Sequence, residues 1–91
     1  MEKDKLLKKE KVILDFYATW CGPCNALSPI IEEVSKETNT ELIKINIEEN
    51  SDLAEQFGIM SLPTVLILKK GEIVNEFVGL RQKEMYLKEL L

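Results

Sequence analysis

The stretch ATWCGPCNALSP, residues 18–29, contains both cysteines of the 91-residue chain and is the most informative part of its sequence. Cys21 and Cys24 are separated by Gly22 and Pro23, and residues with helical apolar spacing follow them. A cysteine pair with this spacing can be a structural cross-link, part of a metal site, or a redox-active pair. The rest of the sequence favours one of these three interpretations.

The structural and metal interpretations are the weaker two. A disulfide across this spacing closes a very short loop, so it would stabilise the fold only slightly as a cross-link. A zinc site uses four protein ligands, or three and a water, and the chain has no histidine and no second cysteine pair. Only a site shared between subunits could serve, and we expect no metal. The spacing therefore favours a redox-active disulfide, Cys21–Cys24.

The composition narrows the classes of partner. Sixteen acidic and 12 basic residues give a net charge of −4, and no basic stripe is available to bind nucleic acid. Residues 1–11 are highly charged and contain no long apolar stretch, so neither a signal peptide nor a membrane anchor is expected. We therefore expect a cytoplasmic protein, in a compartment where thiols are kept reduced.

The periodicity of apolar residues predicts an α/β fold within a single domain, residues 1–91. The first half of the chain is predicted to form a short helix within 1–10, a strand at 11–17, a helix from the cysteines to about Thr38, and a strand at 41–47. A helix capped by Ser51 and stopped by Gly58 follows, and then strands at 64–69 and 72–78, which Lys70-Gly71 joins. The last element is a helix at 80–91 that buries Tyr86, Leu87, Leu90 and Leu91. Because strand–helix–strand units are parallel and the final hairpin is antiparallel, we expect a mixed four-stranded sheet with helices on both faces.

The start of a helix explains why such a cysteine would be reactive. Free backbone N–H groups and the helix dipole favour an anion there, so the thiol pKa of Cys21 should be lowered. The helical phase places Cys24 near the apolar stripe of Leu27 and Ile31 and places Cys21 away from it. We therefore expect Cys21 to be exposed and attacking, and Cys24 to be shielded and resolving. Gly22 should let a partner chain approach closely.

Three further residues stand out, each with two interpretations. Asp15 interrupts an apolar strand: it is either a carboxylate at an edge facing water, or a buried group with a raised pKa that carries protons. Lys44, on the next strand, is the nearest candidate cation, or a lysine that simply faces solvent. Pro63 begins a buried strand and is either an ordinary strand-entry proline or a cis proline.

Several segments in this order resemble the thioredoxin family. They are WCGPC at residues 20–24, preceded by Asp15-Phe16 and followed by Pro29, then KINIE from Lys44, FGIMSLPT from Phe57, and KKGEIV…VG ending at Gly79. The resemblance covers roughly residues 11–91, and it implies the thioredoxin fold and the activity of a protein disulfide reductase.

The resemblance also implies a role for individual residues. Cys21 would be the nucleophile and Cys24 the resolving thiol. Asp15 would accept and donate protons, and Lys44 would tune the proton affinity of Asp15. Pro63 would be cis and lie opposite the disulfide. The surface for a substrate's extended chain would be formed by Trp20, Gly22, Pro23, Met60, Ser61, Leu62, Pro63 and Gly79. The electron donor would be a flavoprotein thioredoxin reductase fed by NADPH, and this chain would bind neither cofactor. The substrates would be disulfide-containing proteins, and the protein itself would be a monomer.

The sequence also departs from the family pattern. Typical members have a strand and a longer helix before the strand of Asp15, and only ten residues precede Lys11 here. We therefore expect the first strand to be missing and one sheet edge to be bare. Asn25 stands where a cation is common and Tyr17 where tryptophan is common, which bears on the choice of reductase and substrate.

Two alternative functions fit parts of the pattern. One is a related enzyme, an oxidase, an isomerase or a glutathione-linked glutaredoxin, which the reduction potential would separate from a reductase. The other is a binding module that keeps the fold without turnover. The intact WCGPC motif, together with Asp15 and Pro63, argues against the binding module.

Overall fold

Four strands form one mixed sheet in the order β2-β1-β3-β4, which confirms the predicted sheet. The structure, a computed structural model, describes all 91 residues. Its elements are α1 (Lys3–Leu7), β1 (Lys11–Tyr17), α2 (Gly22–Thr38), β2 (Glu41–Asn46), α3 (Ser51–Gln56), β3 (Thr64–Lys69), β4 (Glu72–Val78) and α4 (Lys83–Leu90).

The strand order places β1 and β3 at the centre of the sheet and β2 and β4 at its edges. β1 is parallel to β2 and antiparallel to β3, while β4 is antiparallel to β3. Residues Val12 to Phe16 are all buried because both faces of β1 are covered, which is why this strand is apolar throughout except at Asp15. The expected bare edge is present at β2, which has a neighbour on one side only.

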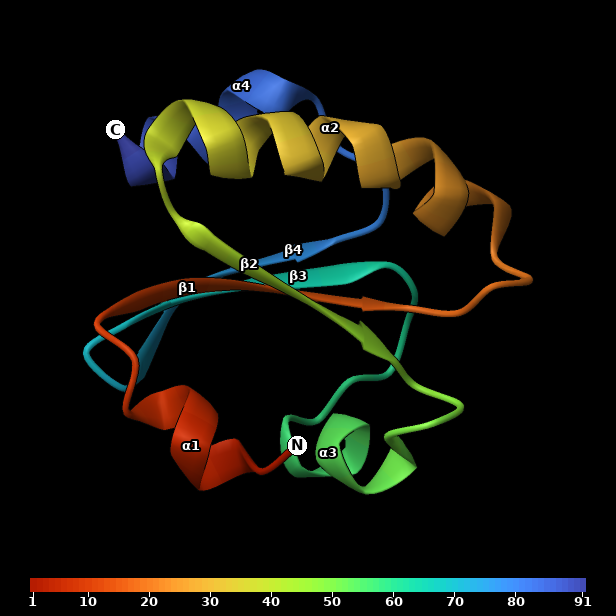
Figure 1. The fold of residues 1–91 in the computed structure, drawn as a ribbon. Helices are drawn as coiled ribbons and strands as arrows, with labels where there is room; N and C mark the ends of the chain where they lie inside the picture. The colour runs from red at the N-terminus through yellow and green to blue at the C-terminus, as the bar shows by residue number, and fades with distance from the viewer.

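Helices cover both faces of the sheet, with α2 and α4 on one face and α1 and α3 on the other (Figure 1). Alternate residues of β1 therefore enter two different cores: Ile13 packs with residues of α2 and α4, and Leu14 packs with residues of α1 and α3. Asp15 shares the parity of Ile13, so it lies on the face that α2 covers. None of the helices combines the length and the apolar character that a membrane crossing requires.

The ends of the shorter elements needed correction. Ser51 is the first residue of α3 and not its cap, because Asn50 holds the N-cap position without a side-chain hydrogen bond. The last helix begins at Lys83 and not at residue 80, and Leu91 follows it with 84% of its surface exposed, so the predicted burial of Leu91 is wrong. The hairpin prediction is confirmed: Lys70 and Gly71 both have positive φ, at 52° and 82°.

Candidate active site

The two cysteines form a disulfide at the N-terminus of α2, with 5.2 Å between their Cα atoms. Cys21 is the N-cap residue, and its sulfur accepts a hydrogen bond of 3.2 Å from the backbone N–H of Cys24. Pro23 occupies the first turn of the helix, where the backbone N–H group that proline lacks would have no helical partner in any case. A free N–H group of this helix end is thus directed at the Cys21 sulfur, where it stabilises negative charge together with the helix dipole.

The expectation that Cys21 is exposed is wrong in degree. Its exposed fraction is 7%, against 3% for Cys24, because Ile47 and Leu62 pack against the cysteines from segments distant in sequence. Helical phase could not predict this, since an N-cap residue has an extended backbone and lies outside the helix. The two cysteines still differ in access, because Cys21 lines the pocket described below and Cys24 does not. Space in front of the motif is open, as no atom lies within 4 Å of a Cβ added at Gly22.

An apolar pocket of about 360 Å³ lies beside Cys21. Four of the residues predicted to bind substrate line it: Trp20, Met60, Ser61 and Leu62. Trp20 and Met60 are unusually exposed for large apolar side chains, at 68% and 95%. The other four, Gly22, Pro23, Pro63 and Gly79, are not among the lining residues. Three residues not predicted from the sequence, Ile47, Ala54 and Ile59, also line the pocket, because the apolar pattern alone identifies them only as core residues.

The Leu62–Pro63 peptide bond is cis, as the resemblance implied. Pro63 is buried, and its carbonyl accepts a hydrogen bond of 2.8 Å from the N–H of Gly79. Gly79 has a φ of +85°, which residues with a Cβ rarely adopt. Gly79 therefore lies beside Pro63 and fixes the loop next to the pocket, although it does not line the pocket itself.

A second hollow of similar volume, about 370 Å³, lies between α1 and α3. It is mostly polar and lined by Glu2, Asp4 and Asp52, among others, and it has no cysteine. Its lining residues belong to α1, α3 and the chain before α1, and these two helices cover the face of the sheet opposite α2 (Figure 1). No cluster of three or more histidine, cysteine, aspartate or glutamate side chains in the structure could hold a metal ion. The apolar pocket beside the disulfide is therefore the candidate active site.

Asp15 is buried beneath α2, with 2% of its surface exposed. Burial raises the pKa of the Asp15 carboxyl to about 6, the charge of Lys44 opposes this rise, and the charge of Glu32 adds to it. One carboxyl oxygen, Oδ1, is buried without a hydrogen-bond partner. A carboxyl group in this environment takes up and releases a proton near neutral pH.

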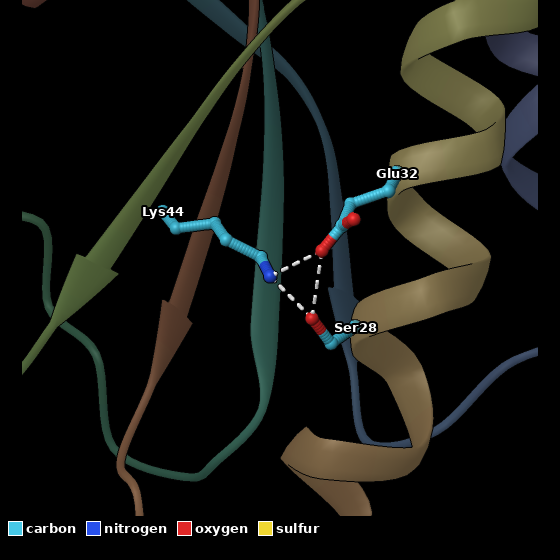
Figure 2. A network of polar contacts seen from close by, with 3 residues as sticks. All are labelled: Ser28, Glu32 and Lys44. Carbon is cyan, nitrogen blue, oxygen red and sulfur yellow. Dashed lines mark hydrogen bonds and ion pairs between the residues drawn. The ribbon is translucent and has the colours of Figure 1, made fainter.

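Lys44 lies directly beside Asp15 in the β1–β2 pair, but its ammonium group bonds elsewhere. It donates to Ser28 Oγ and, across 2.7 Å, to Glu32 Oε2, both on α2, as Figure 2 shows. Ser28 also donates to Glu32 Oε2 across 3.0 Å. These hydrogen bonds from Lys44 and Ser28 lower the pKa of Glu32. Lys44 was predicted from the sequence, but Ser28 and Glu32 were not, although their spacing of one helical turn is a recognisable signal.

Sequence comparison places the chain among known proteins. The family model described as Thioredoxin matches residues 2–91. A thioredoxin of Bacillus subtilis (strain 168) is 45% identical over 82 residues, which are 88% of this chain and 78% of that protein. A thioredoxin of Rickettsia felis is 42% identical over 88 residues, which are 94% of this chain and 84% of that protein.

Solved structures give the same result. The oxidised thioredoxin from Plasmodium falciparum superposes with a TM-score of 0.86 at 34% identity, over 97% of this chain and 89% of that chain. A thioredoxin from Nicotiana alata superposes with a TM-score of 0.84 at 36% identity, over 96% of this chain and 76% of that chain. Fold and sequence thus agree.

Proposed function

Because this chain belongs to the thioredoxin family and is therefore a thiol–disulfide oxidoreductase, we propose that Cys21 and Cys24 carry out the reduction of protein disulfides. The observation that carries the proposal is the position of the Cys21 sulfur. It lies at the N-terminus of a helix, accepts an N–H hydrogen bond, and borders an apolar pocket. A thiolate at this position is stabilised by the helix and is accessible from the pocket.

The reaction requires two exchange steps. The Cys21 thiolate attacks one sulfur of a substrate disulfide, forming a mixed disulfide and releasing the other sulfur as a thiolate. Cys24 then loses its proton and attacks the Cys21 sulfur, which releases the second substrate thiolate. The substrate gains two electrons and ends as two thiols, and the protein ends with the Cys21–Cys24 disulfide seen here.

Asp15 is proposed to accept the proton that Cys24 loses in the second step. Its burial on the face covered by α2 and its pKa of about 6 support this role, because an acceptor works best when its pKa lies near the working pH. Lys44 is proposed to tune Asp15 through its charge. Neither residue is proposed to contact the substrate.

The surface around the pocket is proposed to bind an extended segment of the substrate protein. Trp20, Met60 and Leu62 would supply apolar contacts, and their exposure supports this. The remaining proposed contact residues are Gly22, Pro23, Ser61, Pro63 and Gly79. The open space above Gly22 supports a close approach of the substrate chain.

The wider setting forms part of the same proposal. Electrons would come from NADPH through a thioredoxin reductase, and the redox-active disulfide would be the only redox group in this chain. We propose a cytoplasmic monomer that acts as one domain over residues 1–91. The resemblance to bacterial thioredoxins supports the choice of electron donor.

A coupled assay tests the proposal. The protein is mixed with NADPH, a bacterial thioredoxin reductase and insulin as the disulfide substrate, and NADPH consumption is followed. Consumption should require all components and should disappear in Cys21→Ser. Turnover supported by glutathione and glutathione reductase instead would favour the glutaredoxin alternative. A redox titration of the Cys21–Cys24 pair completes the test, since an oxidising potential would contradict a reductase.

A further inference from the structure

The lysine nearest to Asp15 does not bond to it. Lys44 is the residue directly opposite Asp15 on the neighbouring strand, and a lysine side chain is long and flexible enough to adopt several positions. In the structure its ammonium group is held by Ser28 and Glu32 of α2 (Figure 2), while Asp15 Oδ1 has no partner. The ammonium group is thus bonded to the helix and not to the buried carboxyl group.

Ser28 and Glu32 form a prepared site for this ammonium group. They lie one turn apart on the same side of α2, and the Ser28 hydroxyl donates to the same Glu32 oxygen that accepts from Lys44. The three contacts among Lys44, Ser28 and Glu32 hold the ammonium group in one position, whereas a single surface ion pair would leave it mobile. Half of the Glu32 side chain is exposed, so this network should matter more for the position of a charge than for overall stability.

The charged and titratable groups that influence Asp15 come from three elements. β2 supplies Lys44, α2 supplies Glu32 and also carries Cys24, and α4 supplies Tyr86, whose own pKa the Asp15 charge raises. The residue opposite Asp15 on β3 is the apolar Val65. Lys44 is therefore the single cation that acts on Asp15, and its position is what Ser28 and Glu32 determine.

We propose that Ser28 and Glu32 are positioning residues that hold the Lys44 ammonium group in bonds to α2 and out of a direct ion pair with Asp15, and thereby favour the protonated form of Asp15. Glu32 acts in two ways with the same sign. Its negative charge disfavours the Asp15 anion directly, and its bond to Lys44 keeps the cation from stabilising that anion more strongly through a direct ion pair. The consequence for catalysis rests on the proposed function, but the effect on Asp15 itself does not.

The first test measures the proton affinity of Asp15 by an NMR titration of its carboxyl carbon in the oxidised protein. Glu32→Gln removes the charge and frees Lys44, and it should lower the pKa of Asp15 by on the order of half a pH unit or more. Glu33→Gln is the matched control, because it removes the same charge from the next residue, which pairs with Lys83 instead. An unchanged or raised pKa in Glu32→Gln, or an equal shift in Glu33→Gln, would overturn the proposal.

Two further variants separate position from charge. Ser28→Ala keeps every charge and should lower the Asp15 pKa in the same direction by a smaller amount; no change would remove Ser28 from the proposal. Lys44→Met should raise the pKa, and in that background the effect of Glu32→Gln should shrink to its direct part. An undiminished effect would show that Glu32 does not act through Lys44. Urea unfolding checks that each variant is folded.

The kinetic arm distinguishes this inference from the proposed function. If Asp15 accepts the proton of Cys24, the acid limb of the rate–pH profile should move with the Asp15 pKa in Glu32→Gln. A shifted pKa with an unshifted rate profile supports the positioning roles and overturns the proton-acceptor role of Asp15. An unshifted pKa overturns the positioning roles whatever the rate does.

Discussion

The backbone N–H of Cys24 donates a hydrogen bond to the sulfur of Cys21, so the two cysteines occupy unequal positions at the start of α2. Cys21 is the N-cap residue and borders the apolar pocket, while Cys24 is the less exposed of the two and lies inside the first helical turn. An N–H group directed at Cys21 favours its thiolate form. This asymmetry predicts a fixed order of attack.

The first prediction follows from that order. Cys21→Ser should abolish disulfide reduction, because the remaining thiol is shielded from substrate. Cys24→Ser should still attack but should stop as a mixed disulfide, since the resolving thiol is absent. Mass spectrometry after mixing each variant with a disulfide substrate measures the adduct. An adduct on Cys24 in Cys21→Ser, with none in Cys24→Ser, would contradict the assignment.

The second prediction concerns a buried hydroxyl group on α4. Tyr86 is fully buried, and its hydroxyl makes no hydrogen bond of ordinary geometry. Burial, and next the charge of Asp15, raise the pKa of Tyr86 to about 12, while the Arg81 backbone opposes this rise. Because an unpaired buried hydroxyl is unfavourable, Tyr86→Phe should stabilise the protein by about 1 kcal/mol. The edge-to-face packing against Phe77, with 4.8 Å between the two ring centroids, is retained in this variant.

Urea unfolding of Tyr86→Phe at constant pH provides the measurement, with Tyr17→Phe as the control. Tyr17 is only half-buried, so its change should stay within about 0.5 kcal/mol. A loss of stability in Tyr86→Phe would mean that a partner, such as a buried water, satisfies the hydroxyl group in solution.

The third prediction compares two adjacent leucines at the C-terminus. Leu90 is 5% exposed and belongs to the core beneath α2 and α4, whereas Leu91 is 84% exposed. Leu90→Ala should therefore reduce the free energy of unfolding by about 2–4 kcal/mol, and Leu91→Ala should change it by less than about 0.5 kcal/mol. Comparable losses in the two variants would show that Leu91 packs against the protein in solution.

Local sequence signals predicted most of the fold. The apolar run of β1, the helical spacing of Leu27 and Ile31, and the Lys70-Gly71 turn are each determined by neighbours in the chain. The predictions that failed lie where long-range packing decides. Leu91 continues the helical pattern of α4, but the helix ends before it, and no other element covers it.

The candidate site was predictable only in part, for the same reason. The cysteine pair and Asp15 can be recognised within single elements, because a carboxylate in an apolar strand is unusual in itself. The burial of Cys21 depends on Ile47 and Leu62, which reach it from other segments. The contact of Lys44 with Ser28 and Glu32 joins a strand to a helix, and only the folded chain brings these elements together.

The last prediction concerns Asp15 and the pH dependence of stability. Its pKa rises from an ordinary value of 3.8 to about 6 on folding, so the folded protein binds the proton more tightly than the unfolded chain. The resulting stabilisation of the fold is complete at pH values below the unfolded-state pKa of 3.8, and it is lost as the pH rises through the folded-state pKa of about 6. At pH 8 the ionised carboxyl group therefore reduces stability by about 3 kcal/mol relative to its neutral form.

Asp15→Asn replaces the carboxyl group by a neutral amide of the same shape, so it should remove that loss. The variant should be more stable than the parent protein by up to about 3 kcal/mol near pH 8, and the gain should become small near pH 4, where the folded carboxyl group is already protonated. Urea unfolding of the oxidised proteins at both pH values measures this gain. Asp4 is an exposed carboxylate, so the control variant Asp4→Asn should change stability by less than about 0.5 kcal/mol at either pH.

Disulfide reduction by Asp15→Asn should slow roughly 10-fold or more, because Cys24 loses its proton acceptor. If Asp15→Asn is neutral or destabilising at pH 8, Asp15 does not titrate as a buried group, and its role as the proton acceptor fails with it.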